Sequence, residues 1–361
     1  MDVLVVVEQL RRAVAGGIGT YTLGLLQGLR AMGAEAPAVA LHASRSQAAP
    51  DPLEGLGFPL RRSLLPGPLL TRTWDRGLLG APGPADVVHA TSLAFPAPAK
   101  SPPLAVTVHD LAWQEVPEAY PPRGRQWHEA ALRRAVTRGR LLVTPSRATA
   151  DNLVAAGARP AQVEVVEEGC DHLPPADVEA ARRLLAARGV GDGYLLSVGT
   201  VQPRKNLRRL LEAYDKARPQ LPEPWPLVVV GPEGWGDSLP KSSVPHGVVF
   251  AGVVTGATLA GLYRGARCLA FVPLVEGFGL PPVEAMRECT PVVSSPVPST
   301  AGAALEVDPT DVGAIAAALV QASSDDRVRA ELVTAGLLRT GELTWEAAAR
   351  RHVELWQAMV A

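Results

Sequence analysis

The chain has 361 residues, of which 47% are hydrophobic and 20% are charged, and its formal net charge is −1. This length predicts two domains, and this composition is enough to give each of them a core without metals or disulfides. The balanced charge argues against a nucleic-acid-binding surface, and no apolar run is long enough for a signal segment or a membrane span. The three cysteines are odd in number and form no C-x-x-C pair, so we expect a reducing compartment, the cytoplasm.

In the first half of the chain, apolar runs alternate with helical patterns. The run "VLVVVE" (3–8) is typical of a buried parallel strand, and the glycine-containing segment 17–33 after it has leucines at helical spacing. Further strands are predicted at 36–41, 85–91, 104–110, 141–145 and 163–168. This alternation predicts a doubly wound parallel sheet.

A linker is predicted at 168–177, where "EGCDHLPPAD" interrupts the pattern with Gly and Pro. A second set of strands, interleaved with helices, follows at 194–200, 226–232, 247–254, 268–273 and 291–295. The late stretch "TWEAAARRHVELWQAMV" has one apolar stripe, which should lie against a domain surface and consists of Trp345, Ala349, Val353 and Trp356. We therefore expect an α/β protein with two Rossmann-like halves, residues 1–173 and 174–344, followed by a helix at 345–361.

The most informative stretch is "VPLVEGFGLPPVEAM" (272–286), in which Glu276 and Glu284 are eight residues apart around an elbow between a strand and a helix. The helix is expected to begin at Pro281 or Pro282, because proline suits the first helical position. Glu276 and Glu284 would then lie on either side of an anion and accept hydrogen bonds from hydroxyl groups, or they are ordinary surface glutamates. The anion, such as a phosphate, would bind the backbone amides of Phe278, Gly279 and Leu280.

A second stretch, "VGTVQPRKNLRRLLEAY", places two cations after a strand. We expect Pro203 to open a helix and Arg204 and Lys205 to occupy its first turn. Cations at that end oppose the helix dipole unless an anion shares the site. A diphosphate would satisfy both, with Arg204 as a planar fork and Lys205 as a point charge, while two solvated cations remain the alternative.

Two weaker signals lie in the first half. "AGGIGTY" (15–21) is glycine-rich and opens a helix, but it is neither the G-x-G-x-x-G fingerprint nor a P-loop, so it is a ligand-binding turn or an ordinary one. In "VTVHDLAW", His109 and Asp110 stand at the carboxyl end of a strand, the edge at which open α/β sheets bind ligands. A purely structural histidine is the alternative there.

Taken together, these stretches resemble the retaining glycosyltransferases of family 4, which have the GT-B fold of two Rossmann-like doubly wound domains facing across a cleft. The family's motifs occur in its order over most of the chain, as "GGIGTY", "VHD", "TPS", "GTVQPRKNL", "VVVGP", "LYRGARCLAFVPLVEGFGLPPVEAM", "TPVVSS" and "TWEAAARRHVELW". The resemblance implies an acceptor-side first domain and a second domain that binds a nucleotide sugar. It also implies that the helix at 345–361 packs back towards the first domain.

The resemblance assigns roles to individual residues. The catalytic ones are His109, which would touch the donor sugar near the acceptor, and Glu276, which would contact the transferred sugar. Donor binding would involve the amides of Phe278, Gly279 and Leu280 at the diphosphate or its neighbouring sugar, Glu284 at the ribose hydroxyls, Arg204 and Lys205 at the diphosphate, Gly17 at the distal phosphate from the opposite domain, and backbone groups of Val254 near the nucleobase.

We expect a hexosyltransferase that uses a nucleotide-diphosphate sugar and needs no cofactor. GDP-mannose is slightly favoured over UDP-sugars, because "GTVQPRKNL" and "GPEGWG" resemble the mannosyltransferase-like branch of the family. The acceptor would be a hydroxyl of a glycan, a lipid-linked molecule or a small molecule. The chain contains no D-x-D pair, so no metal is expected, and front-face transfer with retention is the favoured mechanism.

Other functions remain open. The loop "PVPSTAG" (296–302) departs from the family pattern, which keeps a non-catalytic nucleotide-sugar-binding protein as an alternative. A glycoside hydrolase also uses two carboxylates but would leave Arg204 and Lys205 unexplained, and a nicotinamide-dependent dehydrogenase would need the missing fingerprint. The segment 123–140, with six arginines and one glutamate, is a solvated helix face or a contact with a phosphorylated acceptor or an anionic lipid at the inner face of the membrane.

Overall fold

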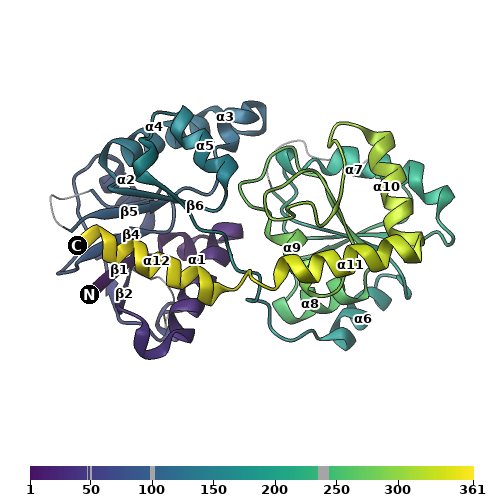
Figure 1. Ribbon diagram of the computed structural model, residues 1–361, viewed down its shortest axis with the longest axis horizontal. Coiled ribbons are helices and arrows are strands. Elements are labelled where there is room, and N and C mark those ends of the chain that lie inside the picture. Colours follow the sequence, from purple (N-terminus) through teal and green to yellow (C-terminus); the bar gives the residue numbers. More distant parts are fainter. Residues whose placement is uncertain (47, 49–50, 98–101, 235–243) are drawn as a thin grey trace. The chain divides into compact units, whose positions relative to one another are not determined.

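The computed structural model describes residues 1–46, 48, 51–97, 102–234 and 244–361 (Figure 1). The chain divides into two compact units. The first contains residues 1–114, 120–169 and 345–361, and the second contains residues 115–119 and 170–344. The first unit is therefore built from segments that lie on both sides of the second unit in the sequence.

The first unit has a parallel sheet of seven strands in the order β3-β2-β1-β4-β5-β6-β7. Its strands are β1 Asp2–Val6, β2 Ala38–Ala43, β3 Leu60–Arg62, β4 Val87–Ala90, β5 Leu104–Thr107, β6 Leu141–Thr144 and β7 Val163–Val165. The helices of this part of the chain are α1 Gly16–Ala31, α2 Gly67–Asp75, α3 Ala112–Glu115, α4 Pro122–Arg138, α5 Arg147–Ala155 and α12 Trp345–Val360. Only β3 was missed by the sequence analysis, because two of its three residues are arginines at the sheet edge.

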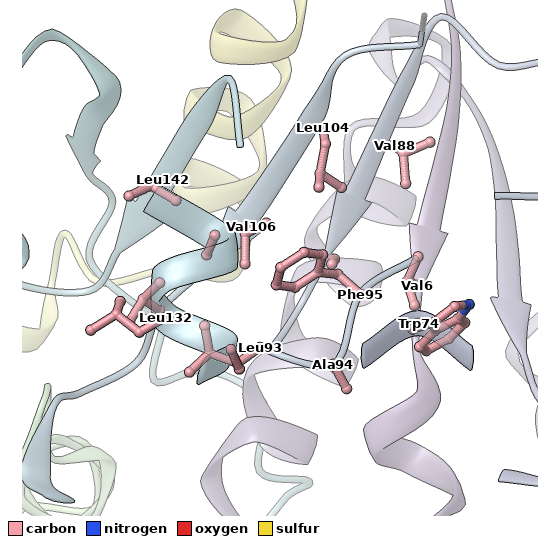
Figure 2. Packing of buried hydrophobic residues seen from close by; sticks show 14 of the residues in the cluster. Val6, Trp74, Val88, Leu93, Ala94, Phe95, Leu104, Val106, Leu132 and Leu142 are labelled. Atoms are coloured by element: carbon pink, nitrogen blue, oxygen red, sulfur yellow. The ribbon is translucent and has the colours of Figure 1, made fainter. Parts of the chain in front are cut away.

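Apolar side chains of neighbouring strands form the core of the first unit, where they pack against α2 and α4 (Figure 2). Val88, Leu104 and Val106 come from adjacent strands, Trp74 from α2 and Leu132 from α4, and all five are buried. This is the arrangement that continuous apolar runs predict, because both faces of a parallel sheet are covered by helices.

The helix α12 packs on α1, as Figure 1 shows with α12 in yellow. The four residues of its apolar stripe are buried, with exposed fractions of at most 6%. Two glycines of α1 make the close approach possible: a Cβ on Gly24 would lie 2.1 Å from the Trp345 ring, and one on Gly28 would lie 2.0 Å from the Trp345 carbonyl oxygen. Any larger residue at these two positions would push α12 away.

The second unit has a parallel sheet of six strands in the order β10-β9-β8-β11-β12-β13. Its strands are β8 Leu195–Val198, β9 Leu227–Val230, β10 Val248–Gly252, β11 Cys268–Phe271, β12 Val292–Ser294 and β13 Leu305–Glu306. Its helices are α6 Val178–Ala186, α7 Leu207–Ala217, α8 Gly256–Gly265, α9 Leu280–Arg287, α10 Val312–Ser324 and α11 Asp326–Thr340. The two-residue strand β13 is too short to leave a pattern in the sequence.

Both sheets confirm the predicted doubly wound α/β class. In each of them the strand order reverses at one place, between β1 and β4 in the first unit and between β8 and β11 in the second. Ligands of open α/β sheets bind beyond the carboxyl ends of the strands at such a reversal. Among the described residues, no helix combines the length and the apolar character needed to cross a bilayer.

Candidate active site

The elbow after β11 is set by Gly279. This residue is the N-cap of α9 and has φ +97°, a left-handed conformation that favours glycine. A Cβ there would also lie 3.1 Å from Ser299 Oγ and 3.2 Å from Val297 Cγ2. Ser299 braces the elbow, because its hydroxyl donates to the Gly279 carbonyl at 2.6 Å and its amide donates to the Phe278 carbonyl at 3.0 Å. The altered loop 296–302 is thus a structural support of the elbow.

The backbone around Gly279 offers amide groups to an anion. The helix begins at Leu280, one residue before the predicted proline. In the part of the chain that the structure describes, the amides of Phe278, Gly279 and Leu280 have no protein acceptor, and the next two residues are prolines without an N–H. Free amides at the start of a helix of this length, with its dipole behind them, suit a phosphate group.

The turn that carries Arg204 and Lys205 differs from the prediction. These residues lie in a separate 3₁₀ turn, Pro203–Lys205, and α7 begins only at Leu207. Asn206 separates the two with φ +57°, and its side-chain amide donates to the carbonyls of Val272 at 2.9 Å and Pro309 at 2.7 Å. Because Arg204 and Lys205 lie outside the first turn of α7, the expected conflict with its dipole does not arise.

Both cations instead contact the elbow. Arg204 Nη1 lies 2.9 Å from Glu276 Oε1 and 3.3 Å from the Val275 carbonyl, and Lys205 Nζ pairs with the same Oε1 atom. The amide of Leu274 donates to the Arg204 carbonyl at 2.8 Å, which joins the turn to the loop after β11. The adjacency of β8 and β11 thus brings three predicted site residues together at the strand-order reversal.

Glu276 is ionised in this arrangement. Burial opposes its charged form, but the nearby Arg204 and Lys205 outweigh burial and hold the pKa of this carboxyl below its ordinary value. The side chain of Glu276 is 10% exposed, and those of both cations are 17% exposed. Two positive charges and one negative charge leave a local excess of +1 beside the free amides.

Glu284 lies in α9 and is buried between two partners. Its Oε1 atom is 2.9 Å from His172 Nε2, and its Oε2 atom accepts a 2.7 Å hydrogen bond from the Tyr263 hydroxyl of α8. Burial and the adjacent carboxylate raise the pKa of Tyr263 well above its ordinary value, so Tyr263 keeps its proton and donates. Each carboxylate oxygen has a second lone pair, which leaves Glu284 able to accept from further hydroxyl groups.

Replacing Tyr263 by Phe should reduce the free energy of unfolding of the second unit by about 1.5–3 kcal/mol. The substitution removes a hydrogen bond to a buried carboxylate, and bonds to charged groups are worth more than bonds between neutral groups. Urea unfolding followed by circular dichroism measures the change. The matched control is Tyr214→Phe, because the Tyr214 hydroxyl, also buried, donates to a neutral carbonyl, that of Trp225, at 2.9 Å. Equal losses for the two variants would show that Glu284 takes no special support from Tyr263.

The remaining predicted site residues lie elsewhere. Val254 is half-buried in the second unit, between β10 and α8. Gly17 is exposed in the first turn of α1 and has open space around the position of a Cβ. His109 follows β5, with Nε2 at 2.9 Å from the Thr91 carbonyl and Nδ1 at 3.6 Å from Glu168 Oε1. Gly17 and His109 belong to the first unit, and all the others belong to the second.

Four residues of these clusters were not found from the sequence: Thr91, Glu168, His172 and Tyr263. Their partners are distant in the chain: Glu284 comes 112 positions after His172 and 21 positions after Tyr263. No local spacing signals such pairs. The one available hint was the histidine in the predicted linker, close to two acidic residues in "EGCDH".

The arginine-rich segment 123–140 forms most of α4. Its face towards the core is apolar, and Arg134 Nη2 contacts Asp75 Oδ1 at 2.5 Å instead of being solvated. Three other arginines of this helix, Arg123, Arg133 and Arg138, are exposed. The motif "GPEGWG", used above to favour a mannose donor, ends in Trp235 and Gly236, which lie outside the described residues.

Comparison with known proteins identifies the family. The model of Glycosyltransferase Family 4 matches residues 15–172, and that of Glycosyl transferases group 1 matches residues 192–325. The O-antigen chain mannosyltransferase B of Escherichia coli is 32% identical over 252 residues, which cover 66% of this chain and 66% of that protein. The D-inositol 3-phosphate glycosyltransferase of Salinispora arenicola is 31% identical over 229 residues, which cover 56% of this chain and 51% of that protein.

The fold has solved counterparts. The crystal structure of Anabaena HepE in complex with UDP and glucose matches with a TM-score of 0.74 at 17% identity, and the match covers 99% of this chain and 100% of HepE. The match to the Escherichia coli relative covers a little less than two thirds of that protein's length, and the match to the Salinispora relative covers about half. These findings and the two parallel sheets show that the chain belongs to the family 4 type of glycosyltransferases with the GT-B fold.

Proposed function

We propose that the chain transfers a hexose, with mannose the first choice, from a nucleotide-diphosphate sugar to a hydroxyl group of a glycan, a lipid-linked molecule or a small molecule. The observation that carries the proposal is the group formed by Arg204, Lys205 and Glu276 beside the free amides of the elbow. A mannose donor is supported by the similarity to a mannosyltransferase. UDP-glucose is the second choice, because HepE has been crystallised with it.

The cations and the amides suit the leaving group of such a reaction. When the bond between the anomeric carbon and the phosphate oxygen breaks, negative charge grows on the diphosphate. Arg204, Lys205 and the amides before α9 are held in place by protein contacts, so they can stabilise that charge without reorganising. No metal is required for this charge balance, and we propose that the transfer is metal-independent.

Glu276 suits contact with the transferred sugar. Both cations use its Oε1 atom, which leaves Oε2 to accept a hydrogen bond from a sugar hydroxyl. Glu284, with one spare lone pair on each oxygen, suits a pair of neighbouring ribose hydroxyls. His109, Gly17 and Val254 keep the roles that the family resemblance implies, namely contacts with the donor sugar, the distal phosphate and the nucleobase.

We propose a front-face mechanism with retention. The acceptor oxygen forms its bond to the anomeric carbon on the side from which the diphosphate departs, and the acceptor proton passes to the leaving phosphate oxygen. The sugar thus exchanges one oxygen for another, and the nucleoside diphosphate leaves with the proton. Detection of a glycosyl-enzyme adduct by mass spectrometry during turnover would contradict this mechanism.

The test of the function is a donor and acceptor screen. The purified chain is incubated with GDP-mannose, UDP-glucose or other nucleotide sugars, a panel of hydroxyl acceptors and a chelator, and the products are analysed by NMR for the anomeric configuration. Transfer with retention in the presence of the chelator is expected. Hydrolysis of simple glycosides would indicate a hydrolase instead, and tight binding of nucleotide sugars without turnover would indicate a binding protein.

Replacing Glu276 by Gln should separate nucleotide binding from sugar transfer. The variant keeps the shape of the side chain but removes the negative charge that compensates Arg204 and Lys205. We therefore expect the free nucleoside diphosphate to bind about tenfold more tightly, because the site gains one unit of net positive charge. Transfer should fall, because an amide accepts a weaker hydrogen bond from the sugar than a carboxylate does.

Calorimetry with GDP and UDP measures the first effect, and initial rates of transfer measure the second. The matched control is Glu212→Gln, which removes a carboxylate that pairs with Arg208 on the exposed face of α7. The control should change neither quantity by more than about twofold, because exposed ion pairs contribute little. Weaker nucleotide binding by Glu276→Gln would contradict a diphosphate site at these cations.

A further inference from the structure

A chain of buried hydrogen bonds in the first unit connects α12 to the strands β4 and β5. The Tyr21 hydroxyl of α1 lies 2.8 Å from His352 Nε2 of α12 and 2.9 Å from Thr107 Oγ1 at the end of β5. Thr107 Oγ1 is in turn 2.8 Å from His89 Nε2 of β4. All four residues are buried, with exposed fractions of at most 2%.

The donor and acceptor roles in this series of hydrogen bonds can be assigned in one consistent direction. His352 Nδ1 lies 2.7 Å from the Ala348 carbonyl, so Nδ1 carries a proton and donates. Burial lowers the pKa of His352 to about 4, so the ring is neutral at pH 7 and Nε2 accepts from the Tyr21 hydroxyl. The Tyr21 oxygen then accepts from Thr107, whose own oxygen accepts from His89 Nε2–H.

The last ring nitrogen in this series of hydrogen bonds, Nδ1 of His89, agrees with this assignment. His89 Nδ1 has no hydrogen-bond partner among the described residues. In the neutral ring with Nε2–H, that nitrogen is a lone pair, whereas the opposite direction would leave an N–H group buried without an acceptor. An unpaired buried N–H is the rarer of the two in proteins.

Tyr21 also contacts His109. The two rings meet edge to face, with centroids 4.7 Å apart and an interplanar angle of 82°. A second contact, from Thr91, also restrains the His109 ring. The Thr91 carbonyl lies 2.9 Å from His109 Nε2, and Thr91 itself is held by its hydroxyl, which donates to the Val6 carbonyl at 3.0 Å. The His109 ring is therefore held between a fixed carbonyl and the Tyr21 ring, with Nε2 protonated.

This arrangement leaves one nitrogen of His109 for a substrate. Nδ1 lies 3.6 Å from Glu168 Oε1, which is too far for a strong hydrogen bond. The side chain of His109 is 14% exposed, whereas Tyr21 and His352 are sealed from solvent. Because Nε2 is engaged by the Thr91 carbonyl, Nδ1 is the ring nitrogen that remains for a sugar hydroxyl.

We propose that Tyr21 and His352 are positioning residues for the transfer reaction: α12 holds the Tyr21 hydroxyl, and the Tyr21 ring sets the orientation in which His109 presents Nδ1 to the donor sugar. The effect that we expect on the rate of transfer rests on the function proposed above. The hydrogen-bond chain itself can be tested without any transfer activity.

The first experiment reads the tautomers directly. Long-range proton–nitrogen NMR spectra of the chain labelled with ¹⁵N-histidine should show the Nδ1–H tautomer for His352 and the Nε2–H tautomer for His89 and His109. His352→Leu should shift the ring signals of His109, because Tyr21 loses its anchor, while Val353→Ala on the same helix should leave them unchanged. An Nε2–H tautomer at His352, or His109 signals that ignore His352→Leu, would overturn the proposal.

The second experiment is kinetic. Tyr21→Phe keeps the ring but removes the hydroxyl, and we expect kcat to fall about tenfold with little change in the KM of the donor, because a small misorientation at the reacting centre slows the chemical step. His352→Leu should do the same, and His352→Gln, whose oxygen can accept from Tyr21, should recover most of the rate. Val353→Ala is the control for a general loss of packing and should keep kcat within about twofold.

Combination with His109→Ala separates positioning from stability. If Tyr21 acts through His109, Tyr21→Phe should have no further effect on kcat once His109 is gone. Full multiplication of the two effects, or a kcat loss in Val353→Ala as large as that in Tyr21→Phe, would overturn the proposal. A wild-type chain that transfers no sugar would contradict the proposed function, and the NMR experiment would still decide the positioning of His109.

Discussion

Replacing Arg204 by Ala is expected to lower kcat for sugar transfer by about 10²- to 10³-fold, the effect of removing one fixed group that stabilises charge in a transition state. Arg204 contacts Glu276 and the Val275 carbonyl, so its guanidinium is already oriented before any substrate arrives. Lys205→Ala should have an effect of similar size, since Lys205 pairs with the same oxygen. The measurement is the rate of nucleoside diphosphate release at saturating donor and acceptor.

The control for this prediction lies four residues further on. Arg208→Ala removes the same charge from a side chain that is 76% exposed and pairs only with Glu212 among the described residues. It should leave kcat within about twofold of the wild type. An equal loss in Arg208→Ala would mean that net charge, and not the position of Arg204 at the elbow, governs the rate.

The first unit should lose stability as the pH falls from about 6.5 towards 4. Four of its histidines have pKa values lowered by burial, namely His42, His89, His128 and His352. Their folded pKa lies below the unfolded value, so in this window the unfolded chain binds protons that the folded chain does not. Stability is therefore complete above about pH 6.5 and decreases as the pH drops.

His352 provides the numerical test. A fully buried histidine whose pKa falls from 6.5 to about 4 contributes roughly 3 kcal/mol that is lost across this window. In urea titrations between pH 6.5 and 5, His352→Gln should have a slope of unfolding free energy against pH that is smaller by up to about 1.4 kcal/mol per unit. Hydrogen exchange of the amides of α12, corrected for the intrinsic rate, reports the first unit specifically.

Asp51 acts below the titrated range of pH 6.5 to 5. Its hydrogen bond to Arg11 lowers its pKa from 3.8 to about 2, so its contribution to stability is lost as the pH falls through these two values. His172→Gln, a change in the second unit, is the control and should leave the exchange of α12 unaffected. An unchanged pH slope in His352→Gln would show that this histidine is charged in the folded chain or exposed to water.

The repeating elements could be predicted from the sequence because their physical cause is local. The apolar run at 3–8 is typical of a central strand of a covered sheet, and strands are found there and in the predicted segment 104–110, as β1 Asp2–Val6 and β5 Leu104–Thr107. The elbow could also be predicted from the sequence, since a glycine before two prolines permits a left-handed cap and a helix start. The edge strands β3 and β13 escaped because they bury little.

The parts that could not be predicted depend on contacts between distant segments. The end of the 3₁₀ turn at Asn206 is fixed by carbonyls of Val272 and Pro309, which lie 66 and 103 residues further on. Without them, "QPRKNL" looks like an ordinary helix start. The partners of Glu284 are hidden in the same way. If a base were recognised through the backbone of Val254, no particular side chain would be required there. The sequence around Val254 would then not predict which nucleotide binds.

The return of α12 to the first unit has a consequence for biosynthesis. The groove on α1 that Gly24 and Gly28 create for Trp345 is made early in translation, but its occupant leaves the ribosome only after the whole of the second unit. Between Gly28 and Trp345 lie 316 residues, so at about 5–20 residues per second the wait is roughly 16 to 63 s. During that time the nascent first unit exposes apolar surface that a chaperone could recognise, and the second unit has time to fold before its neighbour is finished.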